Sequence, residues 1–148
     1  REIELPDGES VSLVLLFPLG LDAREAWAEL REFLGSRAVI QPLFIDSGGG
    51  EHVPTGIVRV RFRREPSDDE VERFALDHAL RPGDRDSSRP MQWSFVPVDL
   101  RSVFLPELVR DLDADPAVEL AWAGALSIHR RARARKPADA RWRDGTFA

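Results

Sequence analysis

Hydrophobic positions along the chain follow two periods, one typical of strands and one typical of helices. Val58, Val60 and Phe62 alternate with arginines, which predicts a strand with one buried face and one solvated face. Between 46 and 56, glycine, serine and proline predict a turn-rich linker. Further apolar runs predict strands over 11–17, 38–45, 91–98 and 118–128.

Two capping boxes mark the starts of helices. Asp22 is followed three residues later by Glu25, and Ser67 by Glu70, a spacing that lets each side chain bond the other residue's backbone amide. The first helix is predicted to end at Gly35, and the second before the Pro-Gly pair at 82–83. A third helix is predicted over 104–112, where a proline is tolerated in the first turn.

The order of these elements predicts an α+β fold, a ferredoxin-like antiparallel sheet with helices on one face. Either the first half supplies the β-α-β opening of this unit, or the unit lies within 56–128 and its missing strand falls in 81–89. We favour the second arrangement. The chain then comprises an N-terminal β-α-β extension (1–50), a ferredoxin-like domain (51–128) and an exposed basic tail (129–148).

Composition and charge exclude several classes of protein. The 148 residues contain no cysteine, which excludes disulfide scaffolds, zinc ribbons and thiol catalysis. The net charge of −5 is uneven, because 129–148 carries +5 and 1–128 carries −10. An acidic body repels phosphates, so we expect no nucleic-acid partner. The longest apolar stretch, 11–21, is too short to span a bilayer, so we expect no membrane partner.

Candidate catalytic residues do not assemble into a set. Asp46-Ser47-Gly48 has the D-S-G form of aspartic and subtilisin-type peptidases, but a second such aspartate or a matching serine and histidine context is missing from the sequence. The pattern therefore favours a strand-ending turn. His52, His78 and His129 lack metal-ligand spacing. We expect no enzyme activity, metal or small-molecule cofactor for this chain.

From Val53 onward the chain resembles the N-terminal propeptides of bacterial subtilisin-like serine peptidases, the inhibitor and folding-chaperone domains that precede the catalytic domain. Val53–Phe62 is similar to the family's opening strand, and Ser67–Phe74 to its first helix. Leu105–Trp122 is similar to its second helix, "D-P-x-V" turn and last strand. The resemblance covers about half the chain, and 1–50 less specifically resembles an extension found on some of these propeptides.

The resemblance implies an intramolecular chaperone and inhibitor whose partner is a subtilisin-like catalytic domain, in cis or in trans. The sheet would pack on that domain, and the segment after the last strand would run through its substrate cleft. A secreted or cell-envelope bacterial location is implied, with a cytoplasmic one left open. Cleft binding would fall to Ser127, Ile128, His129, Arg130 and Arg131, and processing to the region of Arg133, Arg135, Lys136 and Asp139.

Two other functions stay open at the level of sequence. A non-catalytic ferredoxin-like interaction domain would use the same sheet face for a protein partner, and the arginines beside Val58 and Val60 suit either a partner's carboxylates or solvent. A ligand-sensing regulatory domain would need a glycine-bearing strand-to-helix turn. Leu19-Gly20-Leu21-Asp22 is the only candidate for that turn.

Overall fold

The computed structural model describes residues 2–4, 10–12 and 22–128, which divide into two compact units, 1–40 and 41–148. In the first unit, β1 (Glu2–Glu4) pairs antiparallel with β2 (Ser10–Ser12). Residues 13–17 of the predicted strand over 11–17 lie outside the described residues. The helix α1 (Ala23–Leu34) and the 3-10 turn η1 (Gly35–Arg37) follow.

The predicted capping box at the start of α1 is confirmed. The Glu25 amide donates to Asp22 Oδ1 at 2.8 Å, and the Asp22 amide donates to the Glu25 carboxylate at 3.4 Å. Trp27 is buried, and its indole N–H donates to the Ile40 carbonyl at 2.9 Å. The segment after η1 is therefore held against α1 by that bond.

The predicted strand over 38–45 is wrong for residues 38–43. Ala38 has extended backbone, but only β3 (Phe44–Ile45) pairs with another strand. The Ile40 carbonyl accepts a hydrogen bond from Trp27 of α1, and Val39 is 50% exposed, so this segment joins no strand ladder.

The second unit holds one antiparallel sheet, which confirms the predicted α+β fold. Its order is β7-β4-β6-β5, with β3 beside the first residues of β4. From β4 onward the β-α-β-β-α-β sequence and this order are those of the ferredoxin-like arrangement. The elements are β4 (Glu51–Phe62), α2 (Asp68–Asp77), β5 (Leu80–Arg85), β6 (Gln92–Pro97), η2 (Leu100–Ser102), α3 (Leu105–Asp113) and β7 (Val118–Ile128).

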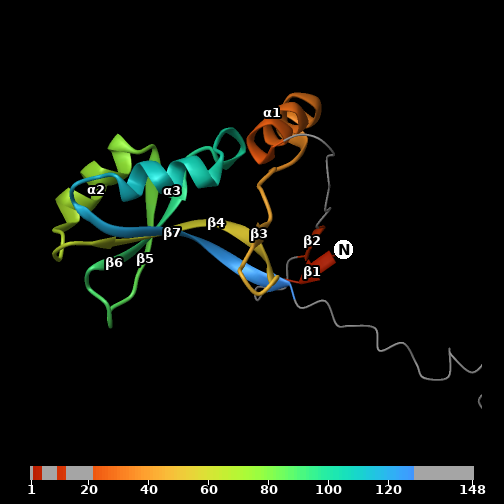
Figure 1. Ribbon diagram of the computed structural model, residues 1–148. Helices are drawn as coiled ribbons and strands as arrows, with labels where there is room; N and C mark the ends of the chain where they lie inside the picture. The colour runs from red at the N-terminus through yellow and green to blue at the C-terminus, as the bar shows by residue number, and fades with distance from the viewer. Residues whose placement is uncertain (1, 5–9, 13–21, 129–148) are drawn as a thin grey trace, which may run out of the picture. The chain divides into compact units, whose positions relative to one another are not determined.

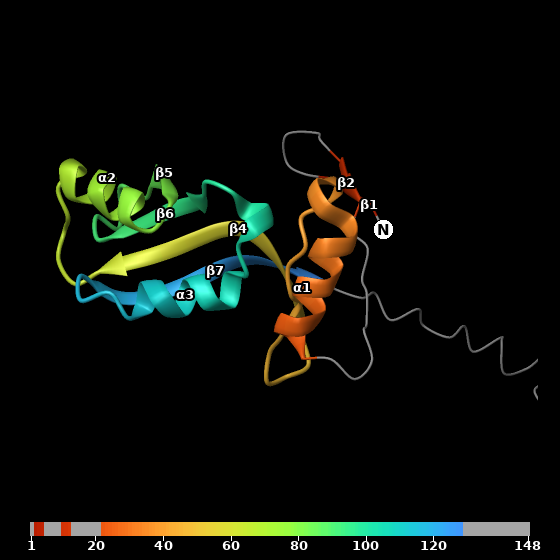
Figure 2. The ribbon, with the colours of Figure 1, turned by 90° about the horizontal axis from the view of Figure 1, so that it is seen from above.

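Both helices of this unit cover the same face of the sheet (Figures 1 and 2). The strand that the sequence leaves weakly marked in 81–89 is β5, so the unit is complete within the second half of the chain. The expected linker over 46–56 is wrong for its second half. Asp46–Gly50 forms the turn of a hairpin, and β4 begins at Glu51.

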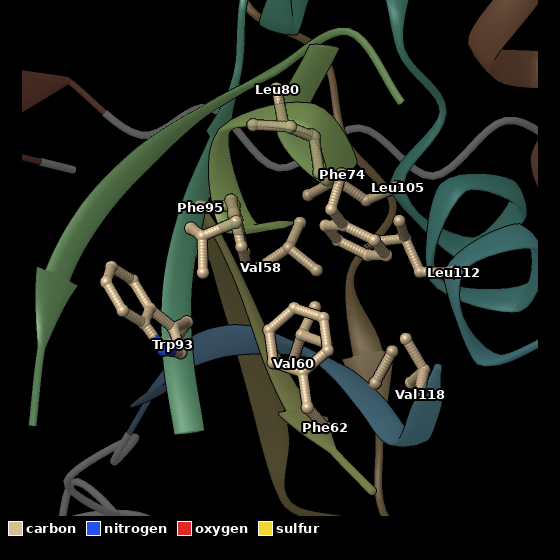
Figure 3. Close-up of a cluster of buried hydrophobic side chains, with 13 residues drawn as sticks. Val58, Val60, Phe62, Phe74, Leu80, Trp93, Phe95, Leu105, Leu112 and Val118 are labelled. Atoms are coloured by element: carbon tan, nitrogen blue, oxygen red, sulfur yellow. The ribbon is translucent and has the colours of Figure 1, made fainter. Parts of the chain in front are cut away.

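The core lies between the sheet and α2 with α3, and Figure 3 shows its side chains. Phe62 meets Phe74 edge to face, with ring centroids 5.0 Å apart. Side chains at every second position of β4 and β6 turn inward, as the alternation predicts. The fully or nearly fully buried members include Val58, Val60, Val71, Phe95, Leu105, Leu112 and Val118.

None of the helices in the described part of the chain has the length and apolar character needed to cross a membrane.

Candidate functional site

The face of the sheet that points away from α2 and α3 is a candidate site of the second unit. Because Val58, Val60 and Phe95 point inward, their strand neighbours point outward. The ladder places Arg59 opposite Trp122 and Arg61 opposite Leu120. We call this surface the outer face, and it comprises Ile57, Arg59, Arg61, Ser94, Val96, Leu120 and Trp122.

The outer face combines apolar and cationic side chains. Ile57 and Leu120 are 37% and 41% exposed, which is high for large aliphatic residues in a sheet. Arg61 Nε lies 3.2 Å from a Glu119 carboxylate oxygen. Arg59 and Arg61 lie on β4, between the edge strand β7 and β6, so the outer face suits a partner that presents carboxylates beside apolar groups.

A line of hydrogen bonds joins the end of β7 to the β3–β4 turn. Ser127 Oγ lies 3.1 Å from His52 Nδ1, and His52 Nε2 lies 2.8 Å from Asp46 Oδ2. With the carboxylate as acceptor, Nε2 carries the proton and Nδ1 accepts from the serine hydroxyl. Asp46 Oδ1 also accepts from the amides of Gly48 and Gly50, at 2.9 and 2.8 Å.

These bonds favour the ionised form of Asp46. The bond from His52 has the largest effect, followed by the amides of Gly50 and Gly48, and together they lower the pKa of Asp46 below its ordinary value of 3.8. We call this line of residues the Asp46–His52–Ser127 clasp. It joins residues that are up to 81 positions apart, and the sequence reading, which found no partners for the D-S-G aspartate, missed it.

The clasp has the residue types of a serine-hydrolase triad, but its surroundings favour a structural role. The side chain of Asp46 is 50% exposed, so water screens its charge, whereas the triad aspartate is buried against its histidine. The same carboxylate also closes its own turn through two amides. We therefore assign the clasp to fixing the last residues of β7 against β4.

A second histidine–aspartate pair closes the other end of the domain. His78 caps the C-terminus of α2, and its Nε2 lies 3.0 Å from Asp115 Oδ2. Burial raises the pKa of Asp115, but the Ala117 amide and His78 more than offset this, so the net pKa lies below its ordinary value of 3.8. The pair ties α2 to the Asp-Pro turn before β7.

The predicted cleft-binding residues divide between described and undescribed parts of the chain. Ser127 and Ile128 are the last residues of β7, where they pair with His52 and Glu51. The remaining predicted residues lie outside the described residues: His129, Arg130 and Arg131 for binding, and Arg133, Arg135, Lys136 and Asp139 for processing.

The described residues contain no group of three or more histidine, aspartate or glutamate side chains that could hold a metal ion. No protein-family model, curated protein or solved structure matches this chain. The outer face and the end of β7 are the candidate functional features of the second unit.

Proposed function

We propose that the second unit acts as the N-terminal propeptide of a subtilisin-like serine peptidase, inhibiting the catalytic domain and assisting its folding. The observation that carries the proposal is the position of β7. It is the last strand of a ferredoxin-like sheet, and it leads directly into the basic segment that would occupy the cleft.

The outer face supports the docking half of this proposal. Both helices cover the opposite face, so Ile57, Leu120 and Trp122 are available to a second protein (Figure 1). Burial of such groups contributes roughly 25 cal/mol for each Å² of apolar surface removed from water. Arg59 and Arg61 would add selectivity for a partner that presents carboxylates.

The fixed end of β7 supports the other part of the proposal, the inhibition of the catalytic domain. Binding a flexible peptide has an entropic cost, which falls when a folded domain already holds the start of the peptide. The Asp46–His52–Ser127 clasp holds that start at Ser127. An extended segment that leaves at this point could then add to a strand in the cleft through its backbone.

The direct test is inhibition of a panel of subtilisin-like peptidases by the full chain and by a variant that ends at Ile128. We expect inhibition by the full chain and at least about a hundredfold weaker inhibition by the shortened variant, because the cleft-binding backbone is gone. Mass spectrometry after incubation should find cleavage between Arg130 and Asp139.

A charge reversal on the outer face tests docking separately. Arg59→Glu should weaken inhibition, whereas Arg73→Glu makes the same change of charge on α2, which covers the other side of the sheet, and should not. Absence of inhibition across the panel, together with digestion of the folded domain, would contradict the proposal. That result would favour a non-catalytic interaction domain that uses the same outer face.

A further inference from the structure

The two edges of the sheet in the second unit are protected unequally. At one edge, β5 contains Pro82, which has no amide to donate, and every residue after Leu80 in this strand is exposed. At the other edge, β7 has no proline and pairs only with β4 among the described residues. A long edge strand without proline or lysine is open to pairing with another strand.

The backbone groups that face this open edge can be identified. The Ala121 amide donates to Asp113 Oδ1 at 3.0 Å, so it points away from β4. Along an antiparallel strand, the backbone amide and carbonyl of successive residues point alternately toward and away from the neighbouring strand. The extra residues at 55–57 belong to β4, so this alternation continues without a break along β7 from Ala121 to Ala125. Ala121, Ala123 and Ala125 therefore turn their amides and carbonyls toward the open edge.

The side chains of this strand are complementary to themselves when it is reversed. Leu120-Ala-Trp-Ala-Gly-Ala-Leu126 reads nearly the same from either end. In an antiparallel pair centred on Ala123, each Leu120 lies opposite a Leu126, and these leucines are 41% and 47% exposed in the single chain. Trp122 lies opposite Gly124 of the second copy, where a Cβ would meet that copy's own Thr55 Oγ1 at 2.9 Å, so the pair of leucines carries the side-chain complementarity.

The same register pairs the backbone hydrogen-bonding groups of the two strands and keeps their charged side chains apart. Ala123 meets Ala123 of the second copy and Ala121 meets Ala125, so outward-facing groups pair with outward-facing groups. The charged residue of the strand, Glu119, lies beyond the matching segment, beside its own Arg61. No like charges are brought opposite each other.

We propose that the chain forms a two-fold symmetric dimer in which β7 pairs antiparallel with β7 of a second copy, centred on Ala123. This joins the two sheets into one and leaves the outer faces uncovered. Pairing along a single strand buries little surface, so the dimer is weak and depends on concentration. The proposal does not rest on the proposed propeptide function, although Leu120 and Trp122 belong both to β7 and to the outer face.

Asp113 competes with the second copy for one of these positions. Its carboxylate accepts the hydrogen bond of the Ala121 amide. In the dimer, that amide would instead donate to the carbonyl of the partner's Ala125. The side chain must rotate away when the dimer forms. Asp113→Ala should therefore strengthen the dimer by about tenfold, because a competing charged acceptor is removed.

Sedimentation equilibrium of the full chain over a range of concentrations tests the dimer, and two matched double variants test its register. Leu120→Glu with Leu126→Glu places like charges opposite each other, whereas Leu120→Glu with Leu126→Lys places opposite charges there. Both variants remove the same two exposed leucines. We expect the first to dimerise about tenfold more weakly than the second.

Amide exchange of the unmodified chain gives a measurement that does not depend on how the variants fold. The amides of Ala123 and Ala125 should exchange more slowly at high protein concentration than at low concentration. A chain that stays monomeric up to its solubility limit would overturn the proposal. Equal dimerisation of the two double variants, or unchanged exchange at Ala123, would overturn the β7 pairing.

Discussion

Along β4, residues 56–62 are buried at every second position beneath the helices, whereas 51–55 are at most half-buried and lie beside the two-residue strand β3. The first of these segments is stabilised by apolar contacts with α2 and α3, as Figure 3 illustrates. The second is tied to β7 through His52. One strand therefore combines a half that depends on burial with a half that depends on polar side chains.

The same substitution in the two halves should give the largest contrast. Val60 is fully buried, so Val60→Ala should lower the free energy of unfolding by about 2.5 kcal/mol through lost burial and an unfilled cavity. Val53 is only partly buried, and Val53→Ala should cost less than about 1 kcal/mol. Urea denaturation of both variants measures this difference, and equal losses would contradict the division of β4.

The residue where the two halves meet should give the next largest effect. Gly56 has a φ of +81°, and a Cβ there would lie 2.5 Å from Leu100 Cδ2. Gly56→Ala should therefore cost about 2 kcal/mol. The double variant with Leu100→Ala separates the two causes, since it relieves the contact but keeps the backbone strain. If the loss of stability in the double variant equals the sum of the losses in the two single variants, Leu100 has no part in the effect of Gly56→Ala.

The smallest effect should be confined to the clasp. His52→Ala removes the link between Asp46 and Ser127, so the amides near the end of β7 should exchange faster while those of Val58 and Val60 are unchanged. Hydrogen exchange followed by NMR resolves the two regions. Faster exchange throughout the sheet would contradict a local role.

The clasp should also respond to acid in a defined direction. Because folding lowers the pKa of Asp46, its contribution is complete above the ordinary value of 3.8 and is lost as the pH falls below it. His52→Ala should reduce this acid sensitivity at the end of β7. Asp86→Asn is the control, because Asp86 also has a lowered pKa but lies in the turn after β5. This variant should leave the acid sensitivity at the end of β7 unchanged.

The sequence predicts the elements whose signals are local. The capping boxes at Asp22 and Ser67 need only residues three positions apart, and both are present in the structure. The alternation of Val58, Val60 and Phe62 predicts the inner face correctly because each residue's face is set by its own strand.

Features that depend on distant partners could not be predicted in this way. Residues 51–55 have a turn-like composition and become a strand because β3 and β7 pair with them. Beyond Leu80, β5 shows no alternation, because all of its remaining residues are exposed. The partners of the clasp, His52 and Ser127, are 75 positions apart, and no spacing rule connects them.

Gln41 has a consequence for how the protein can be divided. Phe104 offers no side-chain cap to α3, and Gln41 takes this role from the start of the second unit. Its Oε1 accepts from the Leu105 amide at 3.2 Å, and its Nε2 donates to the carbonyls of Val103 and Leu100 at 2.7 and 3.3 Å. A fragment cut at the boundary that the sequence suggests, after residue 50, would lose this cap together with β3. The smallest piece suited to independent expression therefore begins at Gln41 and not at Glu51.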